Sequence, residues 1–294
     1  MISAVIVSFR STKVLLQCLN ALASELSEGD EVIVIENSQD REIAEIPLFS
    51  QENFTLKINE FNVGYSKACN QGIQMAANER ILLLNPDTIP KGGAMDALRG
   101  SLLSADANSL FAVELINPDG TRQDYYRRFP SVRAILVMFF IPFRFQHLFQ
   151  SYKHYTYRGD YASRISFEQP PGAGLVVPKN ARLDEEFFVY GSDLMLCWKF
   201  AKNQKHEVTL LPAQFIHLRG QGGTSSSPDL ADWLRVESAR GFAKFYFKSG
   251  QTIRQFSWIL SFATLEAFGV LRFVLHPSQR QRRIKRLREF LARK

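Results

Sequence analysis

Short apolar runs alternate with amphipathic segments through the first hundred residues. The runs at residues 2–8 and 81–84 are a few residues long and rich in Ile, Val and Leu, which predicts strands buried on both faces. Residues 12–26 carry leucines three or four positions apart, which predicts a helix. The predicted strands are 2–8, 31–36, 54–58, 81–84 and 110–116, and the predicted helices are 12–26, 66–77 and 92–103. This alternation is typical of an α/β protein with a doubly wound, mostly parallel sheet.

The pattern becomes less regular after residue 104. Residues 134–143 form an apolar run that is too short to cross a bilayer and that Pro142 interrupts, so we expect it in the core or at a membrane surface. A further helix is predicted at about residues 192–202. From residue 229 onward the chain is expected to be mostly helical.

The C-terminal segment combines apolar and basic character. Residues 256–275 are apolar but contain Glu266 and Arg272, and such charges are costly inside a bilayer, so we expect no membrane-spanning helix. The net charge of the chain is +7, and residues 280–294 supply all of it with eight Lys or Arg and one Glu. We expect a helix in the membrane interface and a basic tail on anionic lipid. The alternative is a helix that packs on the body beside a solvated basic face.

Other features narrow the class of protein. Basic and aromatic residues are not interleaved elsewhere as on a base-stacking surface, so no nucleic-acid binding is expected. Residues 1–8 already read as a strand without a basic leader, so we expect no secretory signal. Cys18, Cys69 and Cys197 lie far apart in apolar helical segments. They are predicted to be reduced core residues, which indicates a cytoplasmic protein.

One carboxylate follows a buried strand directly. Asp87 belongs to Asn85-Pro86-Asp87-Thr88, immediately after residues 81–84. Ligands of open α/β sheets bind just beyond the carboxyl ends of such strands, so Asp87 is a candidate for a metal ion or a phosphate. The alternative is plain turn or helix-cap chemistry. The second copy of the tripeptide, Asn117-Pro118-Asp119-Gly120, is expected to be only a turn.

Polar residues also follow the other early strands. Ser8, Phe9 and Arg10 end the first strand and Glu36 ends the second, so both ends are expected along one sheet edge. Glu36 is suited to accept hydrogen bonds from a base or ribose, although a cap or turn is the alternative. In residues 62–72, Gly64 allows a positive φ before a helix whose first amides are expected to face phosphate or ribose.

Two more polar clusters follow, at residues 184–199 and 215–224. In this order, the clusters resemble glycosyltransferase family 2, whose members have the GT-A fold, and most closely its rhamnosyltransferase-like branch. The resemblance spans residues 1–225, about three quarters of the chain. It is carried by Glu36-Asn37-Ser38, residues 62–72, residues 84–87, Asp119-Gly120, residues 128–131, Gly172-Ala173, residues 184–196 and His217.

The resemblance implies a glycosyltransferase domain at residues 1–228, with a nucleotide-binding half at 1–104 and an acceptor half at 105–228. A helical extension with a basic amphipathic tail would follow at 229–294. The implied enzyme inverts the anomeric centre and uses a nucleotide-sugar donor, either dTDP-rhamnose, from which it would take L-rhamnose, or a UDP-hexose. The implied acceptor is a growing cell-surface glycan, such as a lipopolysaccharide O-antigen, or a lipid-linked saccharide, on the inner face of the cell membrane.

The resemblance also assigns roles to residues. Asp193 is the expected base for the acceptor hydroxyl, and Asp87 with His217 is expected to bind Mg²⁺ or Mn²⁺. The expected nucleotide-sugar residues are Ser8, Phe9, Arg10, Glu36, Asn62, Gly64, Asn70, Asn85 and Asp87, and the expected acceptor-side residues are Gly172, Ala173, Glu185 and Tyr190. Residues 220–228 are expected either to close over the nucleotide or to form a plain linker.

The chain departs from the family pattern at three positions. Glu36 replaces the usual Asp, Ser192 replaces a Glu, and Met195 replaces a second Asp. Loss of the carboxylates around Asp193 removes like-charge repulsion, so we expect a lower pKa for Asp193. The departures also suggest an alternative function, a catalytically degenerate GT-A module that binds a glycan or a partner enzyme.

Overall fold

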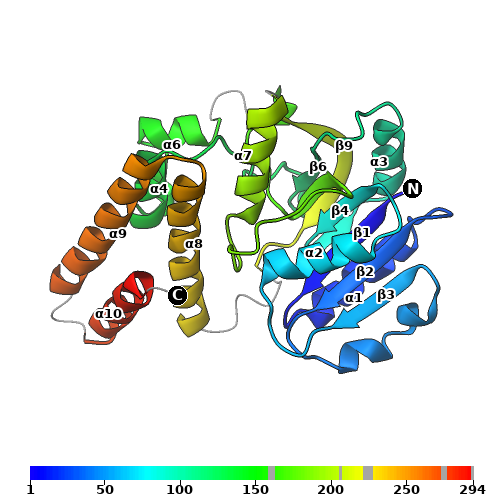
Figure 1. Ribbon diagram of the computed structural model, residues 1–294, viewed down its shortest axis with the longest axis horizontal. Coiled ribbons are helices and arrows are strands. Elements are labelled where there is room, and N and C mark those ends of the chain that lie inside the picture. Colours follow the sequence, from blue (N-terminus) through cyan, green and yellow to red (C-terminus); the bar gives the residue numbers. More distant parts are fainter. Residues whose placement is uncertain (158–162, 205–206, 221–227, 273–276, 293–294) are drawn as a thin grey trace.

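The computed structural model describes residues 1–157, 163–204, 207–220, 228–272 and 277–292. A sheet covered by helices lies beside a group of C-terminal helices (Figure 1). Among the described residues, nine strands form one mixed sheet in the order β3-β2-β1-β4-β8-β6-β9-β5, with β7 paired to β9. The strands are β1 Ser3–Ser8, β2 Glu31–Glu36, β3 Phe54–Ile58, β4 Arg80–Leu84, β5 Thr88–Pro90, β6 Phe111–Ile116, β7 Ser166–Phe167, β8 Gly174–Pro178 and β9 Val208–His217.

The helices follow the predicted periodicity in the first hundred residues. Two short 3₁₀ turns, Glu42–Glu45 and Pro47–Ser50, lie between β2 and β3. The α-helices are α1 Thr12–Ala23, α2 Tyr65–Met75, α3 Ala94–Leu102, α4 Val132–Phe140, α5 Phe143–Gln146, α6 Gln150–Tyr155, α7 Ser192–Gln204, α8 Pro228–Lys248, α9 Thr252–Arg272 and α10 Pro277–Leu291. The prediction of an α/β protein with C-terminal helices is therefore confirmed.

Strands β3, β2, β1 and β4 are parallel neighbours, whereas β8 joins the sheet antiparallel to β4. Every residue of β1 is buried, as expected for a strand with helices on both faces. In the pairing of β1 with β2, Ser8 lies opposite Glu36. The ends of these two strands therefore meet at one edge, as the sequence predicted.

Helix α2 packs closely on β1. A Cβ atom added at Gly72 would lie 2.3 Å from Val5 Cγ1, so only glycine allows this approach. Elsewhere, Asn117 to Gly120 form a tight turn in which the Gly120 amide donates to the Asn117 carbonyl oxygen at 2.9 Å. The second Asn-Pro-Asp copy is thus a turn, as predicted, and the three cysteines are free and buried.

The C-terminal helices share a second apolar core with α4, α7 and the segment before α7. The fully buried Trp258 and Phe262 of α9 pack with Ile135 of α4 and with Phe187 and Leu194. Most of the apolar run that begins at residue 134 lies in α4, where Ala134, Ile135 and Val137 are buried, whereas Phe143 at the end of the run is exposed. Edge-to-face ring contacts such as Phe139–Trp258, with centroids 5.3 Å apart, contribute beyond simple burial.

Helix α9 is long but carries charge. In the described residues, no helix combines the length and the apolar character needed to cross a bilayer. Glu266 of α9 is fully buried and accepts hydrogen bonds from arginines of α8 and α10. One side of α9 thus packs on the body, while Phe256 and Leu260 on its other side are exposed.

Candidate active site

Glu36 ends β2 inside the protein. Its side chain is fully buried, and its Oε1 atom accepts a hydrogen bond from the Ser38 amide at 2.5 Å. The other carboxylate oxygen, Oε2, is buried and has no hydrogen-bond partner among the described residues. Because an unpaired buried oxygen is costly, a hydroxyl or N–H group of a ligand would be a favourable partner. Glu36, which stands where the family pattern has Asp, therefore still presents a hydrogen-bond acceptor at this edge of the sheet.

A hollow of about 570 Å³ opens next to this edge, between the segment after β2 and the end of β3. Its lining includes Gln39, Arg41 and Asn59. Gln39 adopts a positive φ of 65°, and Arg10 at the end of β1 has a φ of 53°. Left-handed backbone at non-glycine residues is uncommon and clusters at functional sites, so this edge has the features of a ligand site.

Asn37 organises the loop that follows β3, and the sequence patterns did not single it out as a site residue. Its Nδ2 donates to Asn62 Oδ1 at 2.8 Å, and its Oδ1 accepts from the Val63 amide at 3.1 Å. Asn62 Oδ1 also accepts from the Gly64 amide at 2.9 Å. The predicted contact residue Asn62 therefore shapes the loop through internal bonds. Its place in the Glu-Asn-Ser motif was the available signal for Asn37.

The start of α2 differs from the expectation. Gly64 has the predicted positive φ, 87°, but the Tyr65 amide donates to the Phe188 carbonyl oxygen at 2.6 Å. The prediction that the first amides of this helix face phosphate is therefore wrong for Gly64 and Tyr65, since both have protein partners. Asn70 likewise bonds the segment before α7, through Leu183 and Glu185 at 2.9 Å each.

Asp87 and His217 lie together beyond β4. Strand β5 pairs with β9 so that Thr88 is opposite His217, and the Leu218 amide donates to the Asp87 carbonyl oxygen at 2.9 Å. This pairing brings His217 Nε2 to 3.4 Å from Asp87 Oδ1. Both side chains are buried, so the two predicted metal ligands form a compact pair inside the protein.

Gln123 fixes the tautomer of His217. Its Nε2 is surrounded by three oxygens, the carbonyls of His217 at 2.7 Å and Ile116 at 3.4 Å and the side chain of Asn117 at 3.1 Å. Its Oε1 therefore points to His217 Nδ1, 2.8 Å away, and Nδ1–H donates. In neutral His217 the lone pair of Nε2 then faces Asp87, which is the arrangement that a metal ligand requires. No motif marked Gln123 in the sequence.

Within the described residues, no three His, Cys, Asp or Glu side chains come together as a complete metal site. Asp87 and His217 offer one oxygen and one nitrogen ligand, and adjacent ligands of one ion lie about 3 Å apart. Mg²⁺ commonly binds one or two protein side chains and completes its coordination with phosphate oxygens and water. The pair fits a cation that is shared with a phosphate-bearing substrate.

Asp193 lies in the first turn of α7. Its Oδ2 accepts a hydrogen bond from the Gly172 amide at 3.2 Å, so the predicted base contacts one of the predicted acceptor-side residues. Burial raises the pKa of Asp193, and the surrounding backbone amides only partly offset that effect. The expectation of a lowered pKa is wrong, because desolvation outweighs the missing carboxylates. A raised pKa makes the carboxylate a stronger base once it is ionised.

Tyr125 lies close to His217, and Tyr190 shortly precedes Asp193. Burial raises the pKa of Tyr190, and the negative charges of neighbouring Tyr125 and Asp193 raise it further. The ring of Tyr125 lies edge-on to His217, with centroids 5.9 Å apart. Arg219 stacks on Tyr125 at 4.4 Å and has a positive φ of 49°. Tyr125 therefore contacts His217, and Tyr190 belongs to the loop that leads to Asp193.

The remaining predicted residues lie at the end of β1, after β4 and before β8. Ser8 is buried, and its Oγ lies 3.1 Å from Ser11 Oγ. The guanidinium of Arg10 stacks on Phe9 at 5.2 Å. Asn85 and Ala173 lie at the turn after β4 and just before β8. The predicted loop 220–228 lies almost entirely outside the described residues.

Comparisons with known proteins identify the family of the chain. Residues 3–171, more than half of the chain, match Glycosyl transferase family 2. No curated protein matches the sequence.

Several solved structures are similar. GalNAc-T7 with UDP, GalNAc and Mn²⁺ has a TM-score of 0.57 and 12% identity over 84% of this chain and 47% of its own, so our chain spans about half its length. The mannosyltransferase PcManGT from Pyrobaculum calidifontis in complex with GDP-Man and Mn²⁺ has a TM-score of 0.52 and 13% identity over 98% and 85%. TarS 1-349 of S. aureus in complex with UDP-GlcNAc has a TM-score of 0.51 and 13% identity over 98% and 89%.

At these identities the likeness shows the fold, which is GT-A, and the family match supplies the activity. The chain belongs to glycosyl transferase family 2, whose typical members are nucleotide-sugar-dependent glycosyltransferases of the inverting, metal-dependent type.

Proposed function

We propose that Asp87 and His217 hold Mg²⁺ or Mn²⁺ against the diphosphate of the donor. The carrying observation is the 3.4 Å contact between Asp87 Oδ1 and His217 Nε2, with the histidine tautomer fixed by Gln123. In that tautomer two acceptors face each other, and a cation between them removes the repulsion. The bound ion would supply Lewis-acid stabilisation of the charge that develops on the leaving diphosphate.

The donor lies, in this proposal, along the edge formed by the ends of β1, β2 and β4. The unpaired Oε2 of Glu36 and the hollow beside Asn59 suit a base or ribose, and Ser8 and Phe9 end the adjoining strand. Arg10 is exposed just after β1, at this edge, and its fixed positive charge suits a diphosphate.

Asp193 acts as the base in this proposal. It takes the proton of the acceptor hydroxyl while the hydroxyl oxygen attacks the anomeric carbon from the face opposite the leaving group. The bond between that carbon and the diphosphate breaks, and the nucleoside diphosphate leaves with the electron pair. Burial of Asp193 raises its pKa and so favours proton transfer to it.

For the donor we propose dTDP-L-rhamnose first, because the chain resembles the rhamnosyltransferase-like branch at residues 84–87 and 128–131. UDP- and GDP-sugars are the next donors, since TarS and PcManGT were solved with UDP-GlcNAc and GDP-Man. For the acceptor we propose a growing cell-surface glycan or a lipid-linked saccharide.

A peripheral position on the inner face of the cell membrane is part of the proposal. Ile253, Phe256 and Leu260 are exposed along one side of α9, and α10 carries exposed Arg282 and Arg288. An apolar stripe next to basic residues suits an anionic lipid surface.

A second candidate function is a degenerate module that binds a glycan or a partner enzyme without turnover. Ser192 favours it, because its Oγ is buried without a hydrogen-bond partner among the described residues where the family has a carboxylate. Asp193, Asp87 and His217 remain in place and argue for the enzyme.

A donor screen tests both candidates. We would measure thermal stabilisation and nucleoside diphosphate release with dTDP-, UDP- and GDP-sugars, Mn²⁺ or Mg²⁺, and lipid-linked and glycan acceptors. We expect one donor to stabilise the protein in a metal-dependent way, Asp87→Asn to lose that effect, and Asp193→Ala to lose turnover. Asp119→Asn, in the second Asn-Pro-Asp copy, is the matched control and should behave as wild type. Binding without turnover favours the degenerate module, and no response to any donor rejects the proposal.

A further inference from the structure

A second hollow, of about 310 Å³, lies between α4 and α8 and beside the loop that leads to α7. One part of its lining is apolar and comes from Met138, Phe139 and Leu234. The other part is polar and comes from Tyr190, Arg235 and Ser238. Ligand pockets typically combine such apolar walls with a few placed polar groups. The hollow therefore has the composition of a binding site for an amphiphilic molecule.

Tyr190 connects this hollow to the base. It comes three residues before Asp193, in the loop that leads to α7. Its ring is 41% exposed, so it is not simply part of a core. A molecule in the hollow would thus lie next to the group that deprotonates the acceptor.

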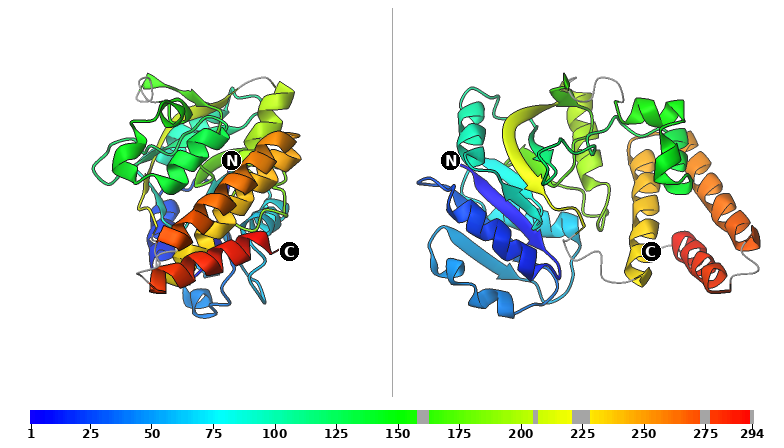
Figure 2. Two further views of the ribbon diagram at one scale, coloured as in Figure 1. Left: turned by 90° about the vertical axis from the view of Figure 1, so that its left-hand side faces the viewer. Right: turned by 180° about the vertical axis from the view of Figure 1, so that it is seen from behind.

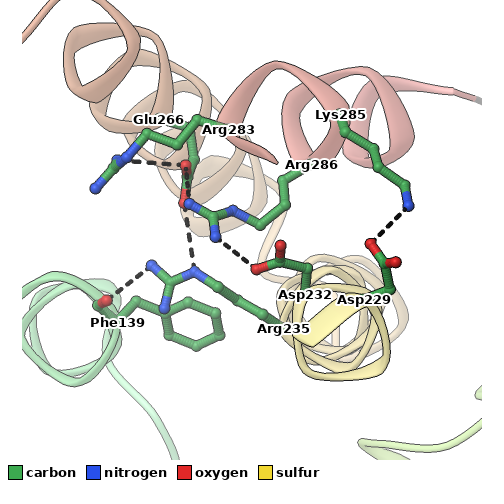
Figure 3. Close-up of polar contacts among 8 residues, drawn as sticks. All are labelled: Phe139, Asp229, Asp232, Arg235, Glu266, Arg283, Lys285 and Arg286. Carbon is green, nitrogen blue, oxygen red and sulfur yellow. Dashed lines mark hydrogen bonds and ion pairs between the residues drawn. The ribbon is translucent and has the colours of Figure 1, made fainter. Parts of the chain in front are cut away.

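Arg235 is held rigidly at the wall of the hollow. Its Nε donates to Glu266 at 3.3 Å and its Nη2 donates to the Phe139 carbonyl oxygen at 2.8 Å (Figure 3). Its guanidinium also stacks on the rings of Phe139 and Phe140, at 5.0 and 5.3 Å. In the described part of the chain, Nη1 has no hydrogen-bond partner. A cation already fixed in one conformation binds an anion at a low entropic cost.

The surroundings of Arg235 carry more positive than negative charge. Arg283 and Arg286 of α10 bind the same carboxylate, that of Glu266, at 3.4 and 3.1 Å, and Arg286 also binds Asp232 at 2.7 Å. Three arginines thus share two carboxylates (Figure 3). Burial lowers the pKa of Arg235, and the two neighbouring arginines lower it further against the effect of Glu266. An added anion would offset this excess.

We propose that this hollow is the acceptor subsite and that it takes an amphiphile with an anionic group, a phosphate or a carboxylate, next to Arg235. The apolar part of the acceptor would lie against Met138, Phe139 and Leu234, and its hydroxyl would point towards Asp193. This inference rests on the proposed transfer reaction, whose atom balance it leaves unchanged. Helix α10 then has a defined task, since its arginines hold Glu266 and thereby the position of Arg235.

Binding of small amphiphiles tests this subsite directly. Octyl phosphate, octanoate, octyl glucoside and inorganic phosphate would each be titrated calorimetrically, as monomers, into protein saturated with Mn²⁺ and the tightest of UDP, dTDP and GDP. We expect an anionic amphiphile to bind at least about tenfold more tightly than octyl glucoside or inorganic phosphate, because only an anionic amphiphile can contact both the apolar lining and Arg235. Tighter binding of octyl phosphate assigns a phosphate-bearing acceptor, and tighter binding of octanoate assigns a carboxylate.

Two variants locate the binding. Arg235→Gln should weaken the binding of the anionic amphiphile about tenfold or more. Ala231→Trp should abolish its binding by filling the hollow without touching the ion pairs. The matched controls are Arg240→Gln, which removes another arginine between α8 and α10, and Ala77→Trp on the exposed loop before β4.

The outcomes separate this inference from the proposed function. Amphiphile binding that survives both Arg235→Gln and Ala231→Trp places the ligand elsewhere and overturns the subsite. A protein that binds a nucleoside diphosphate with Mn²⁺ but no anionic amphiphile overturns the subsite alone. Absence of nucleotide binding overturns the proposed function itself.

Discussion

The buried position of Asp193 suits its proposed role as a base but makes its ionised form less favourable in the folded chain. Backbone amides, including that of Gly172 at 3.2 Å, stabilise the charged form, but burial opposes it and raises the pKa. A higher pKa favours the uptake of a proton from an acceptor. The same burial means that the ionised side chain reduces the stability of the folded chain at neutral pH.

Asp193→Asn should therefore abolish transfer and stabilise the fold. We expect at least about a hundredfold loss of turnover. A carboxyl group with a raised pKa stabilises the folded state most at low pH and loses that contribution as pH rises through its folded pKa. Asp193→Asn has no carboxyl group to ionise at this position, so it does not lose this stability as pH rises. Its thermal midpoint should therefore exceed that of wild type at pH 7 and approach it at low pH. Thermal unfolding between pH 4 and 8 measures the difference.

Asp184→Asn is the control with the opposite sign. Burial alone would raise the pKa of Asp184, but hydrogen bonds from Lys248 and the Glu186 amide outweigh it and lower the pKa. A carboxylate with a lowered pKa stabilises the fold above its unfolded pKa, so this variant should be less stable than wild type at pH 7. Equal effects from both variants would contradict our account of Asp193.

Gln123→Leu should weaken metal binding although Gln123 is not a ligand. Without the acceptor at Nδ1, His217 loses the bond that keeps the Nε2 lone pair towards Asp87. Loss of such a supporting bond costs about ten- to a hundredfold in metal affinity. Titration of Mn²⁺ by electron paramagnetic resonance, with nucleoside diphosphate present, measures it. Gln214→Leu, on the same strand as His217 but bonded to Glu114, is the control, and equal losses would refute the role of Gln123.

The sequence predicted those site residues that belong to local motifs. Asp87 follows a buried strand and Asp193 starts a helix, so the local sequence pattern and the family resemblance predicted both residues. Gln123 and Tyr125 lie in no such motif, because their positions depend on β9, more than ninety residues further along. Contacts between such distant segments follow from packing, which local periodicity does not encode.

At the scale of elements, the parallel half of the sheet was predictable because each strand and helix there is a short, uniform pattern. The second core was not, because it joins α4 to α9 across more than a hundred residues. The apolar residues of α9 were compatible with lipid or with protein. Glu266 shows that one side of α9 packs against protein, because its buried carboxylate requires the arginines of α8 and α10 as partners.

Glu266→Ala should therefore destabilise the C-terminal helices strongly. The substitution leaves Arg235, Arg283 and Arg286 close together without their shared carboxylate, and breaking such a buried pair costs about 3–5 kcal/mol. Urea unfolding followed by tryptophan fluorescence measures the loss, because Trp258 lies in the same core. Glu237→Ala, which removes a smaller pair with Arg240, should cost less than about 1 kcal/mol. Similar costs for both would mean that the cluster is not a stabilising one.

At the scale of the whole molecule, the C-terminal helices form the end opposite the sheet. Viewed from that end, α9 and α10 lie in front, with α4 and α6 beside them (Figure 2, left). Ile253, Phe256 and Leu260 of α9 are each at least 68% exposed, which is unusual for three large apolar residues on one side of a helix. The proposed acceptor hollow lies between α4 and α8.

Binding to vesicles tests whether this end contacts a membrane. We expect the protein to sediment with vesicles containing anionic phosphatidylglycerol and to bind neutral phosphatidylcholine vesicles weakly, with an affinity that falls as salt rises. Replacement of Arg280, Arg282 and Arg288 by Gln should reduce anionic binding about a hundredfold, since each basic residue contributes about 1 kcal/mol. Replacement of Ile253, Phe256 and Leu260 by Ser should reduce binding to both vesicle types. Leu103→Ser, which removes an exposed leucine on the sheet side, is the control. If all variants bind alike, or if the apolar replacements instead change the oligomeric state, the exposed stripe of α9 contacts protein and not lipid.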